Sequence, residues 1–174
     1  MKPVECAEWK ALAASGWVML DVRPPEEVAR CAVPGSVNVP LFLVDPDRSL
    51  GGLLKQWAAF GTGGWWLGGA HMKTNPDFLL DTLRKLPKDK PVVVACQKGL
   101  RSLTACEQLV KAGYPTVAWL SGGFDAAAKE HFDSDTGKDM RYGSVAGVSG
   151  MIGWTKVQQE EGVRPVRATQ AASC

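Results

Sequence analysis

The sequence lacks the features that mark several large classes of protein. Twenty lysine and arginine residues are balanced by eighteen acidic ones, giving a formal net charge of +2, so no concentrated basic face for nucleic acid is expected. No apolar run approaches the ~18 residues of a membrane-spanning helix. Two histidines and five cysteines without a close CxxC pair form no metal-ligand pattern, so neither a metal nor another cofactor is expected.

The first ten residues, MKPVECAEWK, also lack the marks of a targeting segment. They have no apolar core of a secretory signal and no Arg- and Ser-rich character of a transit peptide. Two alternatives remain: the protein stays where it is made, or a targeting segment has been removed. The odd number of cysteines favours a reduced compartment in which most thiols are inert.

What is present fits one globular domain followed by a tail. The 174 residues are 45% hydrophobic and 22% charged, which is ordinary for a soluble domain with a sizeable core. We expect the domain to span residues 1–136, with a long glycine- and tryptophan-rich insertion at about 45–73. Residues 137–174 are expected to form a tail with a short helix around 151–159.

Strand-like and helix-like segments alternate along the domain, which indicates an α/β fold with a parallel sheet covered on both faces. Strands are expected at residues 17–22, 37–39, 92–95 and 116–120. Helices are expected at 4–14, from 25, at about 50–57, 74–86 and 102–112, and in a short segment that follows 122–123 and ends near 131.

Cys96 is the residue most strongly placed for chemistry. It follows the apolar strand 92–95 directly and precedes a helix, and open parallel sheets bind ligands at the carboxyl ends of their strands. Gly99 permits a tight turn, and a short loop curling into a helix directs backbone N–H groups toward an anion. Lys98 and Arg101 add positive charge, so we expect a nucleophilic thiolate near neutral pH.

The competing interpretation of Cys96 is that of a small buried hydrophobic residue at a strand end, which is the common case for a cysteine. The coincidence of basic residues, a glycine and a strand–loop–helix position favours the reactive site.

Three ordered motifs resemble those of the rhodanese family. The first, amino-terminal motif consists of Leu20-Asp21-Val22-Arg23-Pro24 with Glu26-Glu27, followed by Val33-Pro34-Gly35-Ser36-Val37-Asn38-Val39-Pro40. The second is the Cys96–Ser102 loop, and the third is the 112–124 segment with Gly122-Gly123. The resemblance implies a central parallel sheet of five strands with helices on both faces.

The same resemblance implies a sulfurtransferase. In such an enzyme Cys96 takes sulfane sulfur from an anionic, thiosulfate-like donor and passes the persulfide sulfur to a thiol or cyanide. Four residues separate Cys96 from Arg101, whereas related phosphatases have five, so phosphatase activity is disfavoured. The active-site loop would consist of Gln97, Lys98, Gly99, Leu100, Arg101 and Ser102.

The resemblance also suggests roles around that loop. The backbone of residues 97–102 would hold the persulfide, while Lys98 and Arg101 would attract the donor. Asp21 and Arg23 are interpreted as structural residues near the site. The turn at 122–123 is expected to lie beside the pocket and shape it.

Trp65 and Trp66 in the insertion suggest either an exposed aromatic patch for a partner or a loop folded over the sheet edge. The insertion and the tail are similar to rhodanese-like proteins of plant and algal chloroplasts, which implies a chloroplast location with the transit peptide absent; the cytoplasm is the alternative. The alternative function is a protein-interaction or redox-sensing module, associated with thylakoid membrane complexes and docking through the Trp65–Trp66 loop or the tail.

Overall fold

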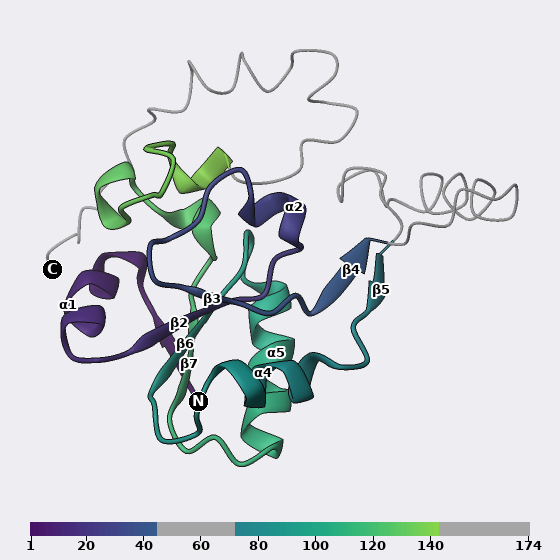
Figure 1. The fold of residues 1–174 in the computed structure, drawn as a ribbon. Coiled ribbons are helices and arrows are strands. Elements are labelled where there is room, and N and C mark those ends of the chain that lie inside the picture. Colours follow the sequence, from purple (N-terminus) through teal and green to yellow (C-terminus); the bar gives the residue numbers. More distant parts are fainter. Residues whose placement is uncertain (45–71, 143–174) are drawn as a thin grey trace, which may run out of the picture.

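The centre of the molecule is a five-stranded sheet in which every pair of neighbouring strands is parallel. The computed structural model describes residues 1–44 and 72–142. The strand order is β1-β7-β6-β2-β3, and β2, β3, β6 and β7 are labelled at the centre of Figure 1. The strands are β1 (Lys2–Val4), β2 (Val18–Asp21), β3 (Val37–Asn38), β6 (Val92–Ala95) and β7 (Val117–Leu120).

Helices cover both faces of this sheet. Helix α1 (Trp9–Ala14) lies on one side, and α4 (Phe78–Lys85) and α5 (Leu100–Lys111) lie on the other (Figure 1). The short helix α2 (Pro25–Val28) follows β2, and β4 (Phe42–Val44) pairs with β5 (Met72–Thr74) in a separate antiparallel ladder. The remaining helical turns are the 3-10 segments η1 (Cys6–Glu8), η3 (Phe124–Ala126), η4 (Lys129–His131) and η5 (Met140–Tyr142). The predicted α/β class with five parallel strands is therefore confirmed.

Strand β6 is buried on both faces, which explains its continuous apolar sequence. Val93 packs in a cluster with Trp9 of α1, while Val94 packs in a second cluster with Leu109 of α5. All four residues of the strand have 0% of their surface exposed. Strand β6, which ends directly before Cys96, is thus the most buried strand of the sheet, and the following loop begins from an enclosed position.

Several element boundaries differ from the sequence prediction. The helix expected at 4–14 is preceded by strand β1 and begins with the 3-10 turn η1; three residues are too few for a periodic signal, and Pro3 is tolerated because β1 is an edge strand. Helix α5 begins at Leu100, two residues earlier than expected, and the expected helix ending near His131 is two 3-10 turns. The predictions for residues 45–71 and 151–159 fall outside the described residues.

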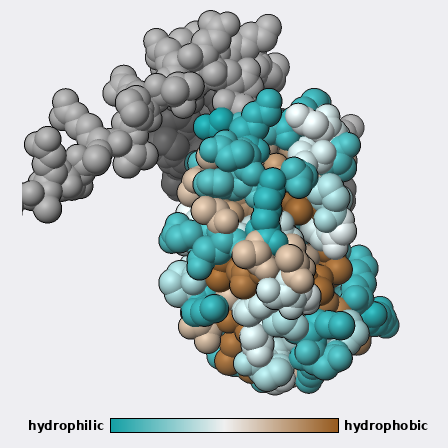
Figure 2. All heavy atoms as spheres, turned by 90° about the vertical axis from the view of Figure 1, so that its left-hand side faces the viewer, coloured by the Kyte–Doolittle hydropathy of each residue, from teal (hydrophilic) through white to brown (hydrophobic). Residues whose placement is uncertain are grey.

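Among residues 1–44 and 72–142, the exposed large apolar side chains lie mainly on α4 and α5. The face on which α1 lies carries intermixed hydrophilic and hydrophobic atoms (Figure 2). Leu80 and Leu83 on α4 and Val110 on α5 are exposed, and Leu100, in the Cys96 loop, is 78% exposed. In the part of the chain that the structure describes, no helix has the length and apolar character needed to cross a membrane.

Candidate active site

Cys96 lies at the carboxyl end of β6, and its loop closes within three residues. Gly99 has a φ of +87°, a left-handed conformation that glycine adopts without strain, and α5 begins at the next residue. The thiol is buried, with 1% of the residue exposed, whereas Lys98 and Leu100 are exposed on the outside of the loop. The loop therefore encloses the sulfur and presents its longer side chains to solvent.

Backbone and hydroxyl groups surround the sulfur of Cys96. The Gly99 N–H donates to Sγ at 3.1 Å and the Ser102 N–H donates to it at 3.4 Å. The Ser102 hydroxyl lies 3.6 Å from Sγ and is itself held by the Gly99 carbonyl at 2.7 Å. Two N–H groups at the start of α5 thus converge on one sulfur, as the loop sequence predicted, and this arrangement stabilises negative charge there.

Arg101 forms an ion pair with a residue to which the sequence analysis gave no role. Its guanidinium forms two hydrogen bonds to the Glu27 carboxylate of α2, at 3.2 and 3.0 Å. Burial alone would lower the pKa of Arg101, but the hydrogen bonds and charge of Glu27, with smaller contributions from Cys96 and Asp21, raise the pKa above its ordinary value. Arg101 therefore remains a cation, and its charge is paired with the Glu27 carboxylate.

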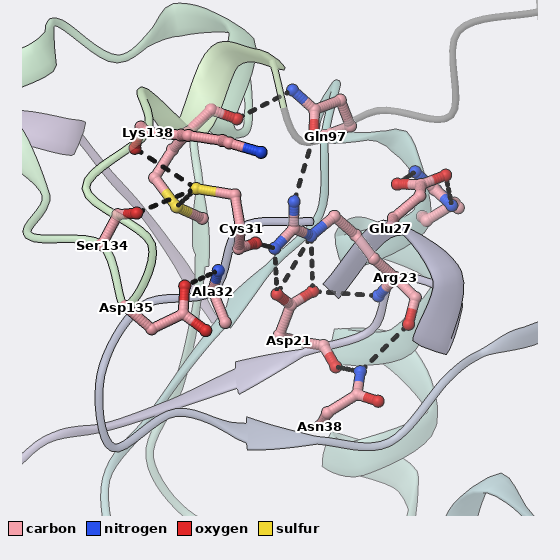
Figure 3. Close-up of polar contacts among 12 residues, drawn as sticks. Asp21, Arg23, Glu27, Cys31, Ala32, Asn38, Gln97, Ser134, Asp135 and Lys138 are labelled. Atoms are coloured by element: carbon pink, nitrogen blue, oxygen red, sulfur yellow. Dashed lines mark hydrogen bonds and ion pairs between the residues drawn. The ribbon is translucent and has the colours of Figure 1, made fainter. Parts of the chain in front are cut away.

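Asp21 and Arg23 form an ion pair below the loop (Figure 3). Both side chains are 0% exposed, and the shortest contact, from Nη2 of Arg23 to Oδ2 of Asp21, is 2.6 Å. Arg23 also donates to the Cys31 carbonyl at 2.8 Å and lies 4.5 Å above the centre of the Phe124 ring. Through these contacts Arg23 links the end of β2 to Cys31 and to Phe124; the structural role expected for the pair stays a prediction.

The side chain of Gln97 joins this ion pair to the end of the described chain. Its Oε1 accepts a hydrogen bond from Nη1 of Arg23 at 3.3 Å, and its Nε2 donates to the Arg141 carbonyl at 3.0 Å. Nε2 also contacts the Asp125 carboxylate and the Met140 carbonyl. Residues 140 and 141, which we expected in the tail, therefore contact Gln97 in the Cys96 loop.

The turn at 122–123 lies against the loop, where it was expected. The N–H groups of Phe124 and Asp125 donate to the carbonyls of Cys96 and Gln97 at 3.0 and 2.9 Å. Gly123 itself sits so close to these carbonyls that a Cβ atom there would overlap both oxygens. The turn thus fixes the path of the backbone at Cys96 and Gln97.

Two of the other cysteines are in environments that favour the protonated thiol. Burial raises the pKa of Cys6 to about 11 and that of Cys106 to about 12, so neither is a nucleophile at neutral pH. Cys31 faces the 134–140 segment, with Sγ 3.2 Å from the Ser134 hydroxyl and 3.0 Å from Sδ of Met140. No group of side chains able to hold a metal ion occurs among the described residues.

A family model for the rhodanese-like domain matches residues 6–130. The chain belongs to the rhodanese family. This match includes β2, the Cys96 loop and the 122–123 turn, which carried the sequence resemblance.

Individual relatives agree with the assignment to the rhodanese family. The chain is 38% identical to the Arabidopsis thaliana rhodanese-like domain-containing protein 11, chloroplastic, over 88% of this chain and 53% of that protein. It is 39% identical to rhodanese-like domain-containing protein 10 of the same plant, over 86% of this chain and 71% of the relative. It is 31% identical to thiosulfate sulfurtransferase 16, chloroplastic, of Arabidopsis thaliana, over 68% of this chain and 79% of that protein. The chain thus spans about half the length of the first of these relatives.

Solved structures support the fold. The crystal structure of Rv0390 from M. tuberculosis superposes with a TM-score of 0.50 at 20% identity, over 76% of this chain and 86% of that one.

Several side-chain contacts of the Cys96 loop could not be predicted from the sequence motifs. Glu27 was part of a motif without an assigned role, and the side-chain contacts of Gln97 were not predicted. The partners of Gln97 lie 28 to 74 residues away in the chain, and no short-range pattern indicates contacts over such a separation. Glu27 and Arg101 are 74 residues apart in the chain, so no local sequence pattern predicts their pairing either.

Replacing Arg23 with methionine is expected to destabilise the domain by about 3–5 kcal/mol, because the Asp21 carboxylate would remain buried without its cation. Urea unfolding followed by circular dichroism measures the loss. The double variant Asp21→Asn/Arg23→Met removes both charges and should recover a large part of it. Equal losses in the single and double variants would contradict this explanation.

Proposed function

We propose that the protein is a sulfurtransferase that carries sulfane sulfur on Cys96 as a persulfide. The donor would be a small anion of the thiosulfate type, and the acceptor would be a thiol or cyanide. The observation that supports this best is the convergence of the Gly99 and Ser102 N–H groups on Sγ of Cys96. Relatives named as thiosulfate sulfurtransferases support the same class of reaction.

The reaction consists of two displacements at sulfur. The Cys96 thiolate attacks the outer sulfur of thiosulfate, the S–S bond of the donor breaks, and sulfite leaves with the electron pair. An acceptor thiolate then attacks the terminal sulfur of the Cys96 persulfide, and the Cys96 thiolate is released. The N–H groups that hold Sγ stabilise the anion in both steps, and Lys98 attracts the charged donor from solvent.

The rival proposal is a protein-interaction or redox-sensing module on the same fold. Such a module would dock through the Trp65–Trp66 loop or through residues 137–174, in association with thylakoid membrane complexes. The cysteine enclosed by N–H donors favours chemistry over this role. We further propose a chloroplast location, on the strength of the relatives whose names carry that word; the cytoplasm is the alternative.

Incubating the protein with thiosulfate and measuring its intact mass tests the proposed activity. We expect the wild type to gain one sulfur atom and to lose it on addition of cyanide, with thiocyanate as the product. If thiosulfate fails, mercaptopyruvate and a small persulfide test other donors. Failure of all three would reject the sulfurtransferase and favour the interaction module.

A further inference from the structure

The ion pair between Glu27 and Arg101 lies beside the proposed sulfur site and is largely removed from water. The Glu27 side chain is 4% exposed and that of Arg101 is 17% exposed, with a shortest contact of 3.0 Å. Both carboxylate oxygens and two guanidinium nitrogens take part, a bidentate geometry that fixes the charges relative to each other. The two groups therefore act on the site together.

The pair changes the charge that an incoming donor meets. Arg101 is close enough to Cys96 for the two groups to interact electrostatically, and alone it would add a full positive charge beside the sulfur. The Glu27 carboxylate supplies the opposite charge at the same place. The remaining cation of the loop, the exposed Lys98, has no ion-pair partner within the described residues, and water screens its charge more strongly.

Charge compensation acts differently on donors of different charge. The Coulomb energy between a fixed charge and a ligand scales with the charge of the ligand, so an uncompensated Arg101 would favour a dianion about twice as strongly as a monoanion. A neutral pair gives neither donor that advantage.

We infer that Glu27 is a specificity-determining residue that removes the preference for doubly charged sulfur donors which Arg101 would otherwise create. This inference rests on the proposed sulfur transfer through Cys96. It assigns to the motif position 27 a function in substrate choice, in addition to the link that it forms between α2 and the active-site loop.

Two small donors of nearly the same shape separate the effect of charge from that of size. Thiosulfate carries two negative charges, and methanethiosulfonate carries one because a methyl group replaces an oxygen. In both cases the Cys96 thiolate attacks the outer sulfur and the donor S–S bond breaks. The electron pair leaves with sulfite or with methanesulfinate, so each reaction ends in the same Cys96 persulfide.

The experiment compares kcat/KM for the two donors, with cyanide as acceptor, in the wild type and in Glu27→Gln. We expect the ratio of kcat/KM for thiosulfate to kcat/KM for methanethiosulfonate to rise about tenfold in Glu27→Gln, because the Arg101 charge would no longer be compensated. Glu26→Gln is the matched control: Glu26 is the exposed neighbour on α2, and its ratio should stay within about twofold of the wild type.

A second variant keeps the test decisive if Glu27→Gln does not fold. Glu27→Gln/Arg101→Gln removes both charges and leaves two amides that can bond to each other, and its ratio should remain within about threefold of the wild type. An unchanged ratio in folded Glu27→Gln overturns the inference, as does a loss of thiosulfate preference beyond about tenfold in the double variant. If neither donor loads sulfur onto the wild type, the proposed function itself fails; a working transfer with an unaltered ratio rejects only the role of Glu27.

Discussion

Cys96→Ser is expected to abolish sulfur loading, with a fall in the rate of transfer of more than ~10³-fold. A serine hydroxyl is only weakly nucleophilic and cannot hold sulfane sulfur as a persulfide. The N–H groups of Gly99 and Ser102 that point at Sγ would remain, so donor binding should survive in part. Intact mass after incubation with thiosulfate, together with thiocyanate formation, measures both the adduct and turnover.

Cys106→Ala provides the matched control for this variant. Cys106 is also buried, but it lies on α5 with its Sγ 3.5 Å from the Ala118 carbonyl, and its raised pKa keeps the thiol protonated. We expect Cys106→Ala to load sulfur as the wild type does. The proposal that Cys96 carries the sulfur would be contradicted if Cys96→Ser still gained cyanide-labile sulfur. It would also be contradicted if folded Cys106→Ala gained none.

Gly123→Ala is expected to destabilise the domain by more than ~3 kcal/mol and to remove activity with it. Gly123 has a φ of +64° and a ψ of −162°, a region that is essentially restricted to glycine. Its added Cβ would also overlap the carbonyl oxygens of Cys96 and Gln97. The 122–123 turn would have to move away from the loop, which breaks the hydrogen bonds from Phe124 and Asp125.

Gly16→Ala separates the overlap from the strain of a positive φ. Gly16 has a φ of +85°, and a Cβ atom added to it would meet no other atom within 4 Å, so its replacement should cost only about 1 kcal/mol. Urea unfolding and thiosulfate turnover measure both variants. If Gly123→Ala and Gly16→Ala destabilised the domain equally, the overlap of the added Cβ with the Cys96 and Gln97 carbonyls would contribute nothing to the loss of stability.

Much of the fold follows from local sequence patterns. Strand β6 and the Cys96 loop were predicted because an apolar run of strand length followed by a glycine turn and a helix has few other solutions. Helix α4 was predicted from the polar residues that precede it, where the Asn75 side chain accepts a hydrogen bond from the Asp77 N–H at 3.0 Å, three residues before the helix begins at Phe78. These signals are carried by neighbouring residues and need no knowledge of the tertiary structure.

The parts that could not be predicted depend on residues that are distant in the chain. Lys98 and Arg101 look alike in the sequence as two cations of one loop, yet Arg101 is paired with Glu27 and Lys98 is exposed. Strand β1 has only three residues, and its partner is β7, more than a hundred residues later. Neither pairing leaves a periodic pattern, so the charge around Cys96 becomes known only from the structure.

The place of β1 at the edge of the sheet has a consequence for biosynthesis. Lys2 pairs with Ala118 and Val4 with Leu120, so β1 is synthesised more than a hundred residues before its partner β7. At roughly 5–20 residues per second this interval lasts on the order of ten seconds, during which Val4 and Trp9 lack most of the neighbours that cover them in the finished core. The nascent chain therefore passes through a period in which β1 and the apolar residues beside it are accessible to chaperones, and this edge of the sheet forms only once β7 has been synthesised.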